Sequence, residues 1–473
     1  MAGSVARRLP FYYGWVVVAI AFITMGIGVN TRTSFSLLFP QLLEDFGWTS
    51  ATTAGAFSFG FFATVLYAPL MGALMDKYGP RVVIPIGVVL TATGFALTGH
   101  VTEVWHLYVT LGLLVVGGSI FFSYIGHSTF LPNWFQRRRG LAVGIAYSGV
   151  GVGSLLVLPW MQSMISTIGW QQACWVMAGV LVVLLIPINL LFQRARPSEL
   201  GADYTQADSP NHDGYEERIL NKDWAARDWT LGGAMRTARY WWIFFAFMSA
   251  LAAWYIVQVH QTRYLLEKGF SATEAAFALG LVAFFGIAGQ ISIGHLSDKV
   301  SREWGWTLGA LGFGLCYTTL LLLDLYPNRL VLYVMVAAQG LLGYGIAPIY
   351  SAVAADVFPG KRYGLIFGTL SVGSSIGAGA GPLIAGALYD HYGHYKAAFV
   401  VGFAAAMLSI VFIWLAAPGR IRSRVPVRPA PIATVVVTSN VTPTVDSTHT
   451  QSDFDEDIAN FEKFEPNGEL ARE

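Results

Sequence analysis

The chain has 473 residues, of which 55% are hydrophobic and only 12% are charged, and its formal net charge at pH 7 is +1. A soluble globular protein carries about 25% charged residues. The lower charged fraction of this chain excludes a soluble protein and predicts one that is embedded in a lipid bilayer. The near-neutral net charge gives no indication of a nucleic-acid partner. Cys174 and Cys316 stand alone within apolar runs, a pattern that indicates neither a disulfide framework nor a metal site.

Long apolar runs follow one another along the chain. A helix needs about 20 apolar residues to cross a bilayer, and twelve such runs lie near residues 13–38, 49–75, 82–99, 104–131, 140–163, 171–193, 240–266, 271–297, 305–325, 330–356, 362–388 and 395–417. The first run follows Arg7 and Arg8 and continues to about Phe39, which is too long for the core of a cleaved signal peptide. We therefore expect it to remain as an anchor, in an all-α membrane protein with twelve transmembrane helices.

Two polar segments divide the chain. Residues 194–239 separate the sixth and seventh runs, so we expect six-helix halves over 1–193 and 240–417, joined by a cytoplasmic linker with a short surface helix around Trp224 to Met235. Residues 418–473 are rich in arginine, then in proline, threonine and valine, and finally in acidic residues. Such a composition cannot bury a core, and it predicts a disordered cytoplasmic tail.

The loops alternate in charge. If both termini are cytoplasmic, the cytoplasmic segments hold most of the 29 lysine and arginine residues, whereas the outward loops hold Lys268, Arg329 and Lys396. This distribution follows the positive-inside rule. It predicts a multi-pass protein with both termini in the cytoplasm, and we place it in the plasma (inner) membrane.

The two halves carry the same landmarks. Gly72, Asp76 and Lys77 follow the second run, and the same spacing returns as Gly294, Asp298 and Lys299 after the eighth run. An aromatic residue, a basic cluster and a glycine likewise precede both the fifth and the eleventh run. Repeated membrane halves are typical of secondary transporters that move one half against the other around a central site.

The loop after the second run contains the pattern Gly72-x-x-x-Asp76-Lys77-x-Gly79-x-Arg81. It resembles the loop motif of the major facilitator superfamily, and the resemblance covers about residues 11 to 417. Gly72 would let two helices approach closely, and Asp76 could latch the cytoplasmic side by pairing with a basic side chain or a helix N-terminus. The alternative is a charged turn that only sets topology. The second copy lacks the later glycine and arginine, so we expect Asp298 to form a weaker latch.

A second motif narrows the resemblance. The segment Asn133-Trp134-Phe135-x-Arg137-Arg138-Arg139-Gly140, together with Tyr13-Gly14-Trp15, resembles the monocarboxylate transporter branch and, more distantly, the oxalate/formate antiporters. The resemblance implies a major facilitator fold that works by alternating access, with spans one, four, seven and ten lining the route of a small organic anion such as lactate or pyruvate.

The chain also departs from that branch. Gly286 and Gln290 stand where monocarboxylate transporters carry an Asp and an Arg on span eight, so the branch's proton-coupling carboxylate is missing. Residues 365 to 388 lack the basic residue that oxalate/formate antiporters use in span eleven, which argues against a dianionic substrate.

Arg32 is the main candidate for substrate binding. It lies in the first span, where the resemblance places a basic residue that would seek a carboxylate, and Asn30 beside it is a further candidate for substrate binding. An arginine within a membrane helix costs about 2.5–3.5 kcal/mol on insertion scales, so it is usually retained for a purpose. The alternative is that its side chain reaches the outer headgroups, because only about six residues, roughly 9 Å, separate it from the helix end.

The other candidate residues lie on spans four and seven. Tyr124 and His127 could line the route on span four, and Trp254, Gln258 and Gln261 form a polar and aromatic face on span seven. His127 and His260 are the candidates for proton coupling, because histidine can titrate near neutral pH. Arg263 could attract anions at the outer rim. Packing between helices, or interfacial anchoring for Arg263, is the alternative for each residue.

The sequence therefore predicts a secondary transporter and not an enzyme. No phosphate-binding loop, metal-spaced cluster or nucleophile triad is recognisable, so no cofactor or metal is expected. The expected partners are a small organic anion, with or without a proton, and the bilayer. Two alternatives stay open: a uniporter or antiporter of another solute, dicarboxylate or drug-like, and a membrane sensor that does not transport.

Overall fold

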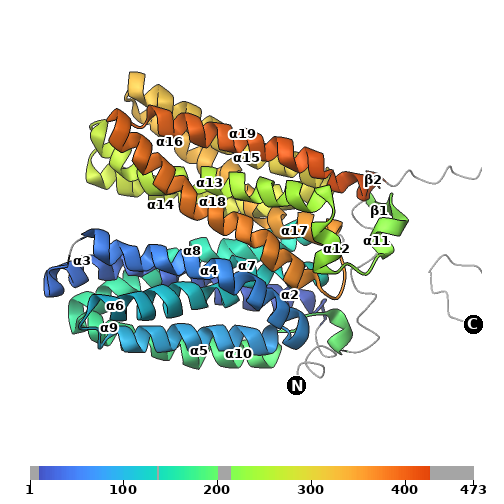
Figure 1. The fold of residues 1–473 in the computed structure, drawn as a ribbon, viewed down its shortest axis with the longest axis horizontal. Helices are drawn as coiled ribbons and strands as arrows, with labels where there is room; N and C mark the ends of the chain where they lie inside the picture. The colour runs from blue at the N-terminus through green and yellow to red at the C-terminus, as the bar shows by residue number, and fades with distance from the viewer. Residues whose placement is uncertain (1–9, 49, 136–137, 201–214, 427–473) are drawn as a thin grey trace, which may run out of the picture. The chain divides into compact units, whose positions relative to one another are not determined.

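The computed structural model describes residues 10–48, 50–135, 138–200 and 215–426. Within these ranges the chain forms twelve helices that are long and apolar enough to cross a membrane, in the order that the sequence predicts. The all-α membrane fold with twelve spans is therefore confirmed. Figure 1 shows the first six spans in blue to cyan-green and the last six in yellow-green to orange-red.

The first half consists, in chain order, of α2 (Gly14–Thr33), α3 (Phe35–Phe46), α4 (Ser50–Tyr78), α5 (Pro80–Thr98), α6 (Val104–Leu107), η1 (Tyr108–Gly117), η2 (Ser119–Phe122), α7 (Tyr124–Ser128), η3 (Leu131–Asn133), α8 (Arg139–Ile168), α9 (Trp170–Val180), η4 (Leu181–Leu185) and α10 (Ile186–Phe192). Those of the second half are α13 (Ala238–Glu267), α14 (Ala272–Lys299), α15 (Arg302–Leu325), α16 (Arg329–Ala337), η7 (Ala338–Leu342), η8 (Gly343–Ile346), α17 (Ala347–Val357), α18 (Tyr363–Tyr392) and α19 (Lys396–Ala416).

Spans four and ten are interrupted in the same way. In span four the π-helical segment η1 passes into the 3-10 turn η2, and the backbone at Ser123 is extended before α7 begins. In span ten η7 and η8 are likewise a π-helical segment and a 3-10 turn before α17. Irregular backbone is tolerated at membrane depth only where protein buries it or where it lines a cavity, so these two interruptions indicate where a binding site could lie.

Glycines bring the two halves into close contact along two helix pairs, α4 with α18 and α8 with α14. A Cβ atom on Gly72 would lie 2.1 Å from the carbonyl oxygen of Gly364, and one on Gly140 would lie 2.1 Å from that of Gly294. Neither position can therefore hold a side chain while the halves are this close. The expectation that Gly72 permits close helix approach agrees with this geometry.

The linker and the segment after α19 lie at the end of the bundle where α4 and α14 end, which we call the linker end (Figure 1). The linker contains η5 (Pro197–Leu200), the strand β1 (Tyr215–Ile219) and the helices α11 (Lys222–Ala226) and α12 (Leu231–Met235). After α19 come η9 (Pro418–Arg420) and β2 (Arg422–Pro426), which pairs antiparallel with β1 so that Ile219 faces Arg422.

Two expectations about these segments need correction. The single surface helix expected around Trp224 to Met235 is two short helices, because Asn221 and Thr230 each start a new helix and Trp229 is buried between them against Phe358. Regular structure continues past residue 418 as far as Pro426, because β2 finds a hydrogen-bonding partner in β1. The rest of the expected tail and Arg137 of the basic cluster lie outside the described residues.

Candidate functional site

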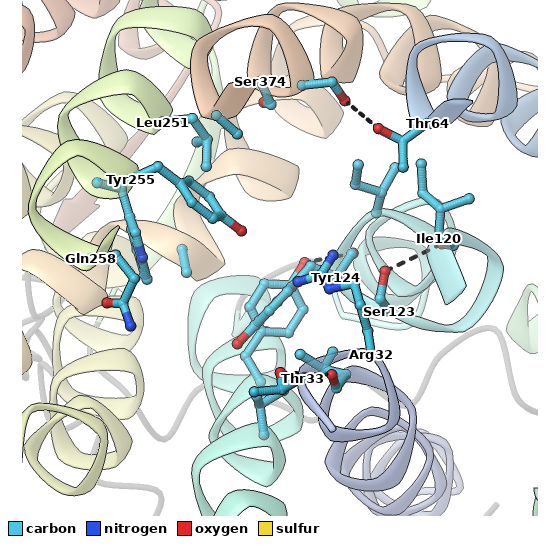
Figure 2. A pocket seen from close by; sticks show the side chains of 18 of the residues that line it. Arg32, Thr33, Thr64, Ile120, Ser123, Tyr124, Leu251, Tyr255, Gln258 and Ser374 are labelled. Atoms are coloured by element: carbon cyan, nitrogen blue, oxygen red, sulfur yellow. Dashed lines mark hydrogen bonds between the residues drawn. The ribbon is translucent and has the colours of Figure 1, made fainter. Parts of the chain in front are cut away.

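A cavity of about 500 Å³ lies between the two halves. Its walls come from spans one, four, seven and ten, as the resemblance implies, and also from α4, α8, α14 and α18. It extends from Tyr147 and Tyr350 to Ser36 and Val259, toward the end opposite the linker end. Figure 2 shows Arg32 and Tyr124 on one side of this cavity and Tyr255 and Gln258 on the other.

Arg32 is the one charged side chain among the described residues that line the cavity. It lies in the last turn of α2, and its guanidinium carbon is 5.3 Å from the centre of the Phe61 ring. No carboxylate lies within ion-pair distance of Arg32 in the described part of the chain. A cation held in a largely apolar cavity without an acidic partner would favour an anionic ligand.

Hydroxyl groups line one part of the cavity, at Tyr124, Ser128 and Tyr147. Tyr124 packs edge-on against Tyr147 at a centroid distance of 4.8 Å, and the Tyr147 hydroxyl donates to the Tyr124 carbonyl at 3.1 Å. The same hydroxyl contacts the Ser128 side chain. The interruption of span four at Ser123 places Tyr124 in this position, beside Arg32 (Figure 2).

The opposite wall is aromatic. The rings of Trp254 and Tyr344 stack at a centroid distance of 4.2 Å and an interplanar angle of 19°, and the Tyr344 hydroxyl donates to Oε1 of Gln258 at 2.7 Å. A Cβ atom on Gly286 would lie 2.5 Å from the Tyr344 ring. Glycine at position 286 therefore makes room for an aromatic ring, which the sequence could not show because the two positions are on different spans.

Asn30, His127 and Gln261 do not line the cavity. Asn30 joins α2 to α8 by donating to the carbonyl oxygens of Gly26 at 2.7 Å and Val150 at 2.9 Å. His127 is fully buried behind the cavity wall, with its Nδ1 atom 3.1 Å from the Ser123 carbonyl oxygen, whereas its Nε2 atom has no hydrogen-bond partner among the described residues. The buried amide of Gln261 also lacks a partner there.

His260 and Arg263 lie nearer the far end of α13, outside the cavity lining. Both ring nitrogens of His260 have partners, because Nδ1 is 3.2 Å from the Tyr395 hydroxyl and Nε2 is 3.1 Å from the Pro382 carbonyl oxygen. Arg263 is exposed and donates to Glu267 at 3.1 Å, with its guanidinium over the Tyr389 ring. Of the predicted substrate residues, the structure thus brings Arg32, Tyr124, Trp254 and Gln258 to one cavity.

At the linker end Asp76 closes the gap between α4 and α18. Its two carboxylate oxygens accept hydrogen bonds from the backbone N–H groups of Gly364 at 2.7 Å and Leu365 at 2.8 Å, in the first turn of α18. A carboxylate at a helix N-terminus is stabilised by the unpaired N–H groups and by the helix dipole. Lys77 and Arg81, the other motif residues, are exposed.

Asp298 makes the equivalent contact on the other side. It accepts from the N–H groups of Gly140 and Leu141, both at 2.9 Å, in the first turn of α8. The repeat seen in the sequence is therefore a repeat of geometry, because each aspartate ends a helix of one half and caps a helix of the other half.

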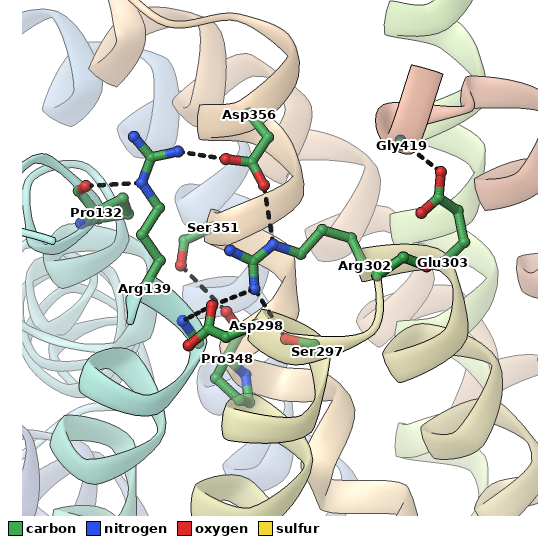
Figure 3. A network of polar contacts seen from close by, with 12 residues as sticks. Pro132, Arg139, Ser297, Asp298, Arg302, Glu303, Pro348, Ser351, Asp356 and Gly419 are labelled. Atoms are coloured by element: carbon green, nitrogen blue, oxygen red, sulfur yellow. Dashed lines mark hydrogen bonds and ion pairs between the residues drawn. The ribbon is translucent and has the colours of Figure 1, made fainter. Parts of the chain in front are cut away.

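The Asp298 side also carries a buried charge network, which Figure 3 shows. Arg302 bonds to Asp298 at 2.6 Å and to Asp356 at 2.9 Å, and Arg139 of the first half forms an ion pair with the same Asp356. Among the described residues, this side has one more contact between the halves than the Asp76 side, the Arg139–Asp356 ion pair. The expectation that Asp298 forms the weaker latch stays a prediction.

Tyr363 connects the latches to the cavity. Its hydroxyl is 3.0 Å from the carbonyl oxygens of both Ser128 and Ser351. Tyr363 is also the first residue of α18, directly before Gly364, whose N–H group donates a hydrogen bond to Asp76. Sequence analysis missed this residue because a lone tyrosine after a basic cluster carries no signal of its own.

The architecture agrees with solved structures of transporters. The crystal structure of the Escherichia coli fucose:proton symporter superposes with a TM-score of 0.62 at 16% identity and covers 85% of this chain and 98% of its own. The proton:xylose symporter bound to 6-bromo-6-deoxy-D-glucose superposes with a TM-score of 0.62 at 14% identity and covers 85% and 95%. At these identities the likeness shows the fold.

Sequence comparison shows the family. Human monocarboxylate transporter 11 is 27% identical over 439 residues, which cover 86% of this chain and 83% of that protein. Monocarboxylate transporter 13 of Bos taurus is 28% identical over 396 residues, covering 82% and 86%. The family model described as Major Facilitator Superfamily matches residues 14–349 and 267–446. The chain therefore belongs to the major facilitator superfamily, is related to its monocarboxylate transporters, and is a multi-pass membrane protein of a transporter family, not an enzyme.

Proposed function

We propose that this protein is a secondary transporter that moves an organic monocarboxylate across the membrane by alternating access. The observation that carries the proposal is the cationic Arg32, which is the single charge in the described lining of a cavity between two repeated halves. One guanidinium matches one carboxylate, because its planar fork can donate two parallel hydrogen bonds to the two oxygens. Asn30 would support Arg32 indirectly, by fixing α2 against α8.

The two latches supply the conformational part of the proposal. Asp76 and Asp298 hold the halves together at the linker end, while the cavity extends toward the other end. With the orientation that the positive-inside rule favours, the linker end and both termini face the cytoplasm, so this state would admit substrate from outside. We also propose that the protein lies in the plasma (inner) membrane.

His127 is the better of the two histidines for proton coupling. It is buried between Ser123 and Ser128, both of which line the cavity, and its Nε2 atom lacks a partner among the described residues. His260 is already held by two hydrogen bonds and lies outside the lining. The proposed proton would thus bind behind the cavity wall and not on a carboxylate within it.

Counterflow in proteoliposomes tests the proposal. We expect purified protein to exchange radiolabelled pyruvate or lactate, and we expect Arg32→Gln to abolish this exchange because the carboxylate would lose its only cation in a desolvated site. Arg32→Lys should restore part of it, since lysine keeps the charge but not the planar fork. Arg329→Gln is the matched control, because that arginine is exposed and outside the cavity. Unchanged exchange in Arg32→Gln would refute the proposal.

A second candidate is a transporter of an uncharged or drug-like solute in which Arg32 is structural. The contact of Arg32 with the Phe61 ring favours it, because a cation–π contact can by itself retain an arginine. Phe61→Leu separates the two accounts. If Arg32 acts only through this contact, Phe61→Leu should impair transport as strongly as Arg32→Gln, whereas an anion-binding Arg32 should remain active beside leucine.

A further inference from the structure

We infer that the substrate is an aromatic monocarboxylate, whose carboxylate binds Arg32 and whose ring lies among the aromatic side chains of the cavity. The inference rests on the proposed function and narrows the class of substrate. It excludes short aliphatic acids as the preferred ligands.

The lining of the cavity is the first observation. Ten of the described residues that line it are aromatic: Phe35, Phe57, Phe61, Tyr124, Tyr147, Trp254, Tyr255, Tyr344, Tyr350 and Phe367. A volume of about 500 Å³ falls within the range of roughly 300–1,000 Å³ that encloses drug-sized ligands. A three-carbon acid bound at Arg32 would leave most of these rings in contact with water, whereas an aryl group would cover them.

The placement of charge and rings is the second observation. Arg32 belongs to the first half, and the stacked pair of Trp254 and Tyr344 belongs to the second half. Phe61 and Tyr255 meet edge-on between the halves, at a centroid distance of 6.0 Å. Figure 2 shows the Tyr255 ring reaching into the space between α13 and Arg32. A ligand with a carboxylate at one end and a ring at the other could bind Arg32 of the first half and the aromatic pair of the second half at once.

The third observation is how the aromatic wall is maintained. Tyr344 is fixed by its hydrogen bond to Gln258 and by the stack with Trp254, and Gly286 leaves the space in which its ring lies. Glycine at position 286 thus allows the Tyr344 ring to form part of the aromatic wall. Aromatic rings prefer offset-stacked or edge-on partners, and this wall offers both arrangements to a ligand ring.

Matched ligands test the inference on the unaltered protein. We would measure the ligand-dependent rise in thermal unfolding temperature of purified protein in nanodiscs, using phenylacetate with acetate and phenylpyruvate with pyruvate. Each pair differs by one ring. We expect the concentration that gives half of the maximal shift to be at least tenfold lower for each aryl acid than for the matching acid without the ring. Phenylacetamide, which keeps the ring but lacks the charge, should give no saturable shift.

Two variants assign the effect to the aromatic wall. Trp254→Ala should raise the phenylacetate concentration needed by at least tenfold and leave that of acetate unchanged, and Tyr255→Leu should act in the same direction if the alanine variant does not fold. Trp105→Ala is the control, because Trp105 is 60% exposed and outside the cavity lining. Arg32→Gln should abolish the response to both acids.

The outcomes separate the two proposals. Equal potency of phenylacetate and acetate, with loss of both responses in Arg32→Gln, would overturn the aromatic inference while supporting a monocarboxylate transporter. A saturable response to phenylacetamide that persists in Arg32→Gln would instead overturn the proposed function, because the cavity would then bind rings without a carboxylate.

Discussion

The two latches differ in which contacts cross between the halves, and this difference predicts how their variants behave. The carboxylate of Asp76 and that of Asp298 each accept two N–H groups from the opposite half. The bond from Arg302 to Asp298 lies within the second half, so it should persist when the halves separate. The N–H contacts therefore set the balance between closed and open states, whereas the Arg302 contact sets the stability of the second half.

The expected magnitudes follow from these contacts. Asparagine keeps one acceptor oxygen but turns an NH₂ group toward the other N–H, so each variant loses a charge-assisted hydrogen bond of about 1.5–3 kcal/mol. A loss of about 2 kcal/mol corresponds to a roughly 30-fold fall in the closed-to-open ratio. We expect this fall in the closed-to-open ratio in both Asp76→Asn and Asp298→Asn. Asp298→Asn should in addition destabilise the folded protein by about 3 kcal/mol, because Arg302 is buried and loses one of its two carboxylates.

Pulsed electron spin resonance distances across the linker end measure the first effect. Spin labels at Tyr78→Cys and Val300→Cys suit this purpose, since both positions are exposed and the native Cys174 and Cys316 are buried. Thermal unfolding of the same samples measures the second effect. If Asp298→Asn moved the distances without lowering the unfolding temperature, or if Asp76→Asn lowered that temperature as much as Asp298→Asn, the division into contacts between and within halves would be wrong.

Two further predictions concern the helix contacts and the histidines. Gly140→Ala should favour the state that is open at the linker end, because its Cβ would lie 2.1 Å from the Gly294 carbonyl oxygen, whereas Gly280→Ala, with no atom within 4 Å, should change nothing in the same distance measurement. His127→Gln should flatten the pH dependence of counterflow, because a histidine side chain can bind and release a proton. His260→Gln should keep that dependence and only lower the unfolding temperature, because it loses bonds between helices. Identical pH profiles in the wild type and His127→Gln would favour exchange without proton coupling.

The sequence by itself determined the class of fold and the location of both latches. Twelve apolar runs suffice to predict twelve spans, because a bilayer leaves the backbone no alternative to satisfying its own hydrogen bonds. The repeat of Asp76 as Asp298 was readable from the spacing of the loop motif, whereas the helix that each aspartate caps belongs to the other half and was revealed by the structure. Arg32 was identifiable because a charge inside a membrane helix is costly wherever it lies.

Only the tertiary structure decided which side chains share the cavity. Helical periodicity places Gln258 and Gln261 on nearly one face of α13, yet packing directs Gln258 to Tyr344 and buries Gln261 away from the lining. The network of Arg302, Asp356 and Arg139 joins residues from three helices of two halves, so no single segment contains it. The aromatic wall depends on Gly286 leaving room for Tyr344 on another span. Such contacts are set by which helices pack together, and a one-dimensional pattern does not specify that choice.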